Sequence, residues 1–288
     1  MSRLPILKTY KLYIGGAFPR SESGRSYIVN AKDGSFVANA AWASRKDARD
    51  AVRAARAATG SWAGATAYNR GQVLYRIAEL LEGRREQFVA EIMEAEGVTR
   101  EAASEQVDAA IDLWVWYAGW TDKVAQVAGN ANPVAGPYFN LTVPEPTGVV
   151  AVIAPQHRVA TLLGFVSVVA PALVTGNTVV VIANELAPLS AITLSEVLAT
   201  SDVPGGVVNV LTGPVAEVAP WLAAHADVNA LDLFGAAELD WVEYEIAAAD
   251  TVKRVVRPDG GADWAAGSLE RILAFIETKT VWHTKSVL

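Results

Sequence analysis

The chain has 288 residues, of which 52% are hydrophobic and 19% charged, a balance typical of a well-packed protein rather than a disordered one. Its 24 basic and 31 acidic residues give a formal net charge of −7, which argues against a nucleic-acid-binding surface. It contains no cysteine, and this excludes disulfides, thiolate metal ligands and thiol catalysis. No apolar run is long enough to span a membrane, and the start lacks a signal-peptide core. We therefore expect a cytoplasmic protein without a membrane partner.

The first half of the sequence favours short strands followed by helices. Two strands are expected within residues 11–34, where apolar stretches are separated by glycines. Ser44 and Asp47 have the spacing of a capping box and predict the start of the first helix. A second helix is expected from near Asn69, with a continuation that ends at Gly97, and a third over residues 100–128, because apolar residues recur at helical spacing.

A turn-rich break over residues 129–137 precedes an alternating segment. Tyr138, Asn140 and Thr142 alternate there with apolar residues, which predicts an exposed strand that forms one arm of a hairpin. The chain ends in another β-rich run, TKTVWHTKSVL, after a short predicted helix, SLERILAFIE.

Residues 143–235 contain short β-branched runs closed by Gly, Pro or Asn, each followed by a longer helical pattern. This alternation predicts βαβ units and therefore an α/β fold with a parallel sheet. One more helix is expected over residues 236–249, and VKRVVRP predicts a last strand of the sheet. The sequence DGGADWAAG, at 259–267, is a second break.

Seven phrases, in this order, resemble the aldehyde dehydrogenase superfamily over residues 10–261. They are YIGGAF, AVRAARAATGSW, RGQVLYRIAELLE, YAGWTDK, PTGVVAVIAP, APALVTGNTVV and VPGGVVNVLTGP. The resemblance implies a Rossmann-like parallel sheet with flanking helices, together with a small β oligomerisation hairpin.

The resemblance also implies a division of the chain. The family's NAD-binding domain would cover residues 1–134 and 147–262, and its oligomerisation strands would cover residues 135–146 and 268–288. The catalytic domain would be absent, with the junction near residues 259–268.

The same comparison of motifs implies that catalysis is lost. The family's cysteine nucleophile lies in the missing domain. His157 stands where the family has an oxyanion-hole asparagine, and imidazole donates one hydrogen bond there at most. Pro258 stands where it has a general-base glutamate, and proline can neither accept nor deliver a proton. No catalytic residue is therefore expected, and the chain on its own is not expected to be an enzyme.

The positions that would contact NAD also depart from the family pattern. They are Pro155, Gln156, Ile182, Glu185, Gly213, Phe234, Gly235 and Ala236. Ile182 replaces a lysine, which removes a contact of about 1.5–3 kcal/mol. Phe234 and Ala236 replace the two hydroxyl residues of a phosphate-binding turn, although a backbone N–H at a helix start can still receive a phosphate. These changes are expected to weaken NAD binding, and we therefore expect no bound cofactor.

Simpler interpretations remain for the other polar residues. Glu185 is expected to be a solvated residue at a strand end, and His157 a surface histidine in a loop. The three histidines lack the spacing of a metal site, so no metal is expected. Walker and GxGxxG motifs are both missing.

The resemblance implies that the chain keeps the family's oligomerisation strands but lacks its catalytic residues. This combination leads to a functional hypothesis. The chain would be a noncatalytic aldehyde-dehydrogenase-like subunit that assembles with a full-length, NAD-dependent aldehyde dehydrogenase, with itself, or with both. Two alternatives stay open: an accessory subunit that contributes surface to a partner's active site, and a module that senses NAD or a fragment of it through assembly.

Overall fold

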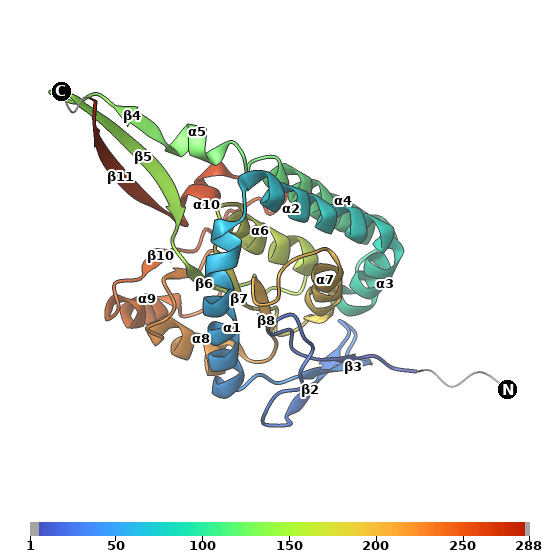
Figure 1. Ribbon diagram of the computed structural model, residues 1–288. Helices are drawn as coiled ribbons and strands as arrows, with labels where there is room; N and C mark the ends of the chain where they lie inside the picture. Colours follow the sequence, from blue (N-terminus) through green and yellow to red (C-terminus); the bar gives the residue numbers. More distant parts are fainter. Residues whose placement is uncertain (1–5, 286–288) are drawn as a thin grey trace.

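The computed structural model describes residues 6–285 and is built around a five-stranded parallel sheet (Figure 1). The strand order is β10–β9–β6–β7–β8, which confirms the predicted α/β fold with a Rossmann-like sheet. The strands are β6 (Val149–Ile153), β7 (Thr178–Ile182), β8 (Val208–Leu211), β9 (Ala230–Asp232) and β10 (Arg254–Val256).

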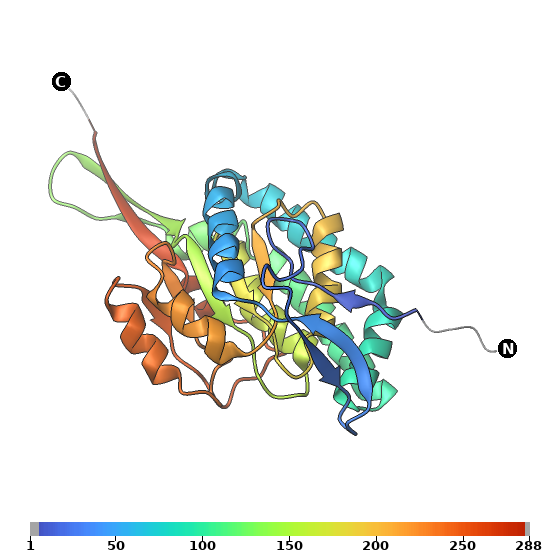
Figure 2. The same cartoon turned by 90° about the horizontal axis from the view of Figure 1, so that it is seen from below.

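Helices cover both faces of this sheet, and the two sets of alternate side chains in each strand pack into two separate cores (Figures 1 and 2). One core contains Val150 and Val179, and the other contains Val149 and Val180. This explains why the strands are almost uninterrupted apolar runs. On the first face lie α2 (Ala67–Gly83), α3 (Arg85–Glu96), α4 (Arg100–Ala118), α6 (Thr161–Val174) and α7 (Leu189–Thr200). On the second lie α1 (Arg45–Gly64), α8 (Val215–Ala224) and α9 (Trp241–Ala249).

Three predicted helices differ from the observed ones. The helix predicted up to Gly97 is divided at Arg84 into α2 and α3, because α2 ends at Gly83 and the chain turns there. The helix predicted over residues 100–128 stops at Ala118; turns follow, and a separate helix α5 (Val124–Ala128) ends the segment. The helix expected from residue 236 begins only at Trp241.

The N-terminal strands form a small sheet of their own, with β3 at its centre. Of the two strands expected within residues 11–34, one is present there as β2; its hairpin partner β3 follows a turn near Gly34, whose φ is +87°, and lies beyond that range. The strands are β1 (Thr9–Tyr10), β2 (Ser26–Asn30) and β3 (Phe36–Ala41).

A third, antiparallel sheet projects from the body of the molecule (Figures 1 and 2). Its order is β11–β5–β4, with β4 (Asn130–Asn132), β5 (Tyr138–Pro146) and β11 (Ile276–Thr284); α10 (Leu269–Leu273) leads into β11. β4 lies before residue 135, so this sheet starts earlier than the predicted oligomerisation strands. Residues 286–288 of the predicted final strand lie outside the described residues.

Polar and apolar residues alternate along β5 as expected, but from Phe139 to Val143 the apolar ones are the more exposed. Phe139, Leu141 and Val143 are exposed, as an exposed strand requires. Asn140 is buried instead, because Asn132 of β4 covers it and donates a hydrogen bond to its side-chain oxygen (2.6 Å). Within residues 6–285, no helix is both long and apolar enough to cross a membrane.

Candidate functional site

The carboxyl ends of β6, β7 and β9 meet at one edge of the parallel sheet, where open α/β sheets bind their ligands. Pro155, Gln156 and His157 follow β6, while Glu185 follows β7. Phe234, Gly235 and Ala236 follow β9. The structure therefore places most of the predicted site residues at the same edge of the sheet.

Ile182 is a core residue at the end of β7. It is 1% exposed and belongs to the same apolar cluster as Leu211 and Val215. Gly213 lies beyond β8 with φ +116°, and a Cβ there would come within 3.3 Å of the Ala43 nitrogen. Both positions contribute to packing, and neither presents a side-chain hydrogen-bonding group.

Gln156 connects the loops that follow β6 and β7. Its Nε2 donates to the Ala154 carbonyl oxygen (2.7 Å), and its Oε1 accepts from the Glu185 N–H (3.0 Å). The Glu185 carbonyl oxygen accepts in turn from the Tyr27 hydroxyl (3.1 Å). The backbone of Glu185 is thus held by the protein itself, and its half-buried carboxylate forms no ion pair among the described residues.

Asn184 is a buried residue of this edge that sequence reasoning missed. Its Nδ2 donates to the carbonyl oxygens of Pro155 and His157, at 2.8 Å each. Its Oδ1 accepts from the N–H groups of Leu186 (2.9 Å) and Ala187 (2.8 Å). An asparagine directly after a strand is the available signal, because its side chain readily bonds to backbone groups two or three residues ahead.

The start of α6 already holds an anion supplied by the protein. The carboxylate of Glu96, which is fully buried, accepts from the N–H groups of Ala160 and Thr161 at 3.0 Å each, and from the Thr161 hydroxyl at 2.6 Å. Gln106 donates to Glu96 (3.1 Å) and accepts from the N–H of Leu162 (3.0 Å). These N–H groups are the ones that would otherwise attract a phosphate.

The turn after β9 is also closed. A Cβ at Gly235 would lie 2.5 Å from the Ile153 carbonyl oxygen, so only glycine fits against the end of β6. The N–H of Ala236 donates to the Leu233 carbonyl oxygen (2.8 Å) and is not free for a phosphate. The Phe234 ring packs edge-on against Trp264, with 5.4 Å between ring centroids.

The two positions that depart from the family's catalytic pattern are His157 and Pro258. The His157 ring lies 6.1 Å from the Trp264 ring, and within residues 6–285 it forms no side-chain hydrogen bond or ion pair. Pro258 follows β10, and its ring nitrogen carries no proton. In the same part of the chain, no cluster of three His, Asp or Glu residues could hold a metal ion.

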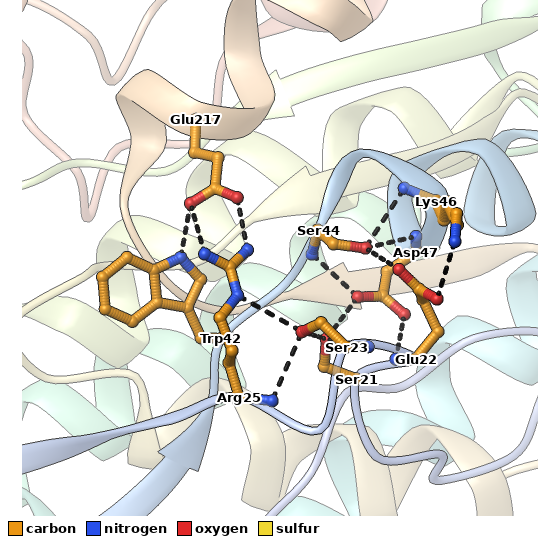
Figure 3. Close-up of polar contacts among 9 residues, drawn as sticks. All are labelled: Ser21, Glu22, Ser23, Arg25, Trp42, Ser44, Lys46, Asp47 and Glu217. Atoms are coloured by element: carbon orange, nitrogen blue, oxygen red, sulfur yellow. Dashed lines mark hydrogen bonds and ion pairs between the residues drawn. The ribbon is translucent and has the colours of Figure 1, made fainter.

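A second polar network ties the N-terminal hairpin and α1 to α8 (Figure 3). Glu217 of α8 accepts from the Arg25 guanidinium and from the Trp42 indole N–H (2.6 Å). Beside it, Ser44 and Asp47 form the predicted capping box, with 2.7 Å from the Ser44 N–H to the Asp47 carboxylate. The hydrogen bond between the two side chains raises the pKa of Arg25 and lowers the pKa of Glu217, so both stay charged.

Known proteins share this architecture. The model of the aldehyde dehydrogenase family matches residues 18–265. The chain belongs to the aldehyde dehydrogenase family. Retinal dehydrogenase 2 of Gallus gallus is 35% identical over 262 residues, which cover 88% of this chain and 49% of that protein. Cytosolic 10-formyltetrahydrofolate dehydrogenase of Mus musculus is 32% identical over 267 residues, or 91% of this chain and 29% of that protein.

The structural neighbours agree with this assignment. The structure of the Bacillus cereus aldehyde dehydrogenase in complex with NAD+ superimposes with a TM-score of 0.79 and 27% identity. The match covers 86% of this chain and 50% of that one. This chain therefore spans about half of such an aldehyde dehydrogenase and less than a third of the formyltetrahydrofolate enzyme.

In the present chain, residues 257–268 connect β10 directly to α10. They are called the closing segment below. Trp264 of this segment covers Phe234 and faces His157. Behind it, Arg271 of α10 forms a two-pronged ion pair with Asp232 at the end of β9, at 3.1 and 2.5 Å. The Arg271 guanidinium also lies 4.1 Å from the Phe234 ring centroid. A pocket of about 560 Å³ remains between α10, β10 and the closing segment.

Proposed function

We propose that the chain is a noncatalytic member of the aldehyde dehydrogenase family that assembles with a full-length, NAD-dependent aldehyde dehydrogenase. The projecting sheet of β4, β5 and β11 is the surface that joins the two. The observation that carries the proposal is an unpartnered apolar face on this sheet.

The apolar residues of that face are Phe139, Leu141, Val143 and Val281, and Lys279 and His283 flank Val281 on the same side. The first three are 54%, 43% and 44% exposed, and Val281 stands directly opposite Leu141 in the antiparallel register. All four side chains point to the same side, because alternate residues of a strand share a face. An apolar face on a projecting sheet is characteristic of an interaction surface.

The outer edge of β11 provides backbone groups for pairing. Among the described residues, β11 pairs with β5 over nine residue pairs and with no other strand. A long edge strand presents a row of unpaired N–H and C=O groups, which a strand from another chain can complete. The edge and the apolar face together fit a partner that extends this sheet.

The noncatalytic part of the proposal is supported by the residues at the sheet edge. The chain contains no cysteine, Pro258 offers no base, and His157 has no polar partner for its ring within the described part. The start of α6 is filled by Glu96, and Ile182 is buried. This arrangement suits a protein that keeps the fold for assembly and positioning.

The test is native mass spectrometry of the tagged chain captured from its own host at native expression level. We expect a defined complex with a full-length aldehyde dehydrogenase, and the mass gives the subunit ratio. The variant Phe139→Asp/Leu141→Asp should lose the partner. The matched control, Val252→Asp, alters a 91% exposed apolar residue away from the projecting sheet and should keep it. A stable monomer, or a complex without a dehydrogenase, would contradict the proposal.

A further inference from the structure

The pocket beneath the closing segment has the size and the walls of a small-molecule site. Its volume of about 560 Å³ lies within the usual range for ligand pockets. Val255, Val256 and Ala274 give it an apolar side, while Phe234 and Trp264 add aromatic rings. Such walls fit a flat, apolar ligand body.

The charges around this pocket favour a cation. Both cationic residues that line it already have partners: Arg257 pairs with Glu245 (2.9 Å) and Arg271 with Asp232. The three acidic lining residues, by contrast, form no ion pair within residues 6–285. They are Asp259, Asp263 and Glu270. An ammonium group near these carboxylates would gain charge-assisted hydrogen bonds, and the Trp264 ring can add a cation–π contact.

Two buried donors in the pocket lining favour an oxygen atom at the other end of the ligand. Tyr117 is 1% exposed; its hydroxyl accepts weakly from the Ser268 N–H (3.4 Å), and its own O–H has no acceptor among the described residues. Arg271 is 6% exposed, and its Nε–H has no acceptor there either. A buried donor without a partner costs stability, so an acceptor oxygen supplied by a ligand is favoured.

We propose that this pocket binds a small primary amine with a flat apolar body and a hydroxyl or carbonyl oxygen at its far end. The ammonium group lies at the acidic rim, the body lies against Trp264 and Val256, and the oxygen points toward Tyr117. All of these groups belong to one chain, so the site does not depend on the assembly proposed above.

The test is isothermal titration calorimetry of the full chain with tyramine, which carries an ammonium group, an aromatic ring and a phenolic oxygen. Two probes of similar shape separate the contributions. Phenethylamine lacks the oxygen, and 3-(4-hydroxyphenyl)propanoate replaces the cation by an anion. We expect saturable binding of tyramine, weaker binding of phenethylamine and no binding of the anion.

Variants locate the site. The double variant Asp263→Asn/Glu270→Gln removes two negative charges from exposed positions at the rim. Because the ammonium group would lose their attraction, tyramine binding should weaken at least about tenfold, which corresponds to about 1.4 kcal/mol. Tyr117→Phe should reduce the affinity for tyramine toward that of phenethylamine. Asp112→Asn, an exposed carboxylate of α4 away from the pocket, is the matched control and should bind as the unmodified chain does.

Three outcomes would overturn the proposal: no saturable heat with tyramine, equal binding of the anion, or equal affinity of the rim variant and the Asp112→Asn control. Circular dichroism of each variant establishes that it is folded, so a loss of binding by the rim variant reports on the pocket.

Discussion

At the scale of single residues, the ion pair between Asp232 and Arg271 fixes the C-terminal part of the chain to the sheet. Asp232 is fully buried, and one of its oxygens also accepts from the Phe234 N–H (3.0 Å). Two charges buried together stabilise little, but removing one of them leaves the other without compensation. The intact pair therefore adds little to the free energy of unfolding, but removing one of its two charges should lower that free energy strongly.

Arg271→Met should lower the free energy of unfolding by about 3–5 kcal/mol, because the Asp232 carboxylate would stay buried without its cation. Urea unfolding followed by circular dichroism measures this change. Glu79→Gln, which breaks a half-exposed pair with Arg76, should leave the stability nearly unchanged. A loss below about 1 kcal/mol for Arg271→Met, the value of an exposed pair, would show that Asp232 is not buried as described.

Glu91 makes stability depend on pH. Burial raises the pKa of its carboxyl above the ordinary value, against smaller opposing effects of Thr193, Lys8, Tyr10 and Gln87. Because the pKa in the folded state exceeds that in the unfolded state, the protonated form stabilises the fold. This contribution is complete below the unfolded pKa of about 4.3 and is lost as the pH rises through the folded pKa.

The variant Glu91→Gln, which stays neutral, should therefore be more stable relative to the unmodified chain at pH 7 than at pH 4. Urea titrations at a series of pH values measure the difference. Glu79→Gln again serves as the control. Its difference in the free energy of unfolding from the unmodified chain should vary less with pH. A constant difference for Glu91→Gln would contradict the raised pKa.

Sequence reasoning found local side-chain contacts and missed the distant ones. The Ser44–Asp47 capping box was predicted because both partners lie in one turn of helix. Glu96 binds the start of α6 across 65 positions of the sequence, and Arg271 binds Asp232 across 39. No local spacing signals such pairs, since their geometry exists only after the sheet and helices have packed.

At the scale of elements, the closing segment depends on one close approach. An added Cβ at Gly267 would overlap the indole ring of Trp116, which packs against Trp120 with 5.5 Å between ring centroids. At Gly260, in the same segment, an added Cβ would meet nothing within 4 Å. The closing segment thus packs against Trp116 near its end, whereas the space around Gly260 near its start is open.

Gly267→Ala should destabilise the protein by about 1–3 kcal/mol through overpacking against Trp116, whereas Gly260→Ala should have little effect. Differential scanning calorimetry of the two variants provides the comparison. Equal melting temperatures would mean that the closing segment does not rest on Trp116.

The elements that sequence predicted best are those with continuous apolar runs. TVVVI, a short β-branched run that is buried at every position, is typical of a strand in a covered parallel sheet. The division between α2 and α3 was missed because the apolar spacing continues through it. β4 was missed because its three residues, Asn130–Asn132, carry no strand pattern and are ordered by pairing with β5.

At the scale of the whole molecule, an aldehyde dehydrogenase fold is present, while the chain's own groups occupy the start of α6 and the N–H of Ala236 in the turn after β9. Isothermal titration calorimetry with NAD, AMP and ADP-ribose should therefore give no saturable heat. The Bacillus cereus aldehyde dehydrogenase, whose structure is known in complex with NAD+, is the positive control. Saturable binding of any of the three would show that a nucleotide site survives, and would favour a sensing role.

Glu96 competes with any phosphate from solution for the N–H groups at the start of α6, because its carboxylate belongs to the same chain. Its carboxylate is delivered by α3, so it never diffuses away, and its effective concentration at the helix start exceeds the roughly millimolar level of a flexibly linked group. A phosphate arriving from solution would have to displace it and leave a buried carboxylate without its three donors at the start of α6. The predicted absence of nucleotide binding would thus follow from competition within the fold as well as from missing contacts.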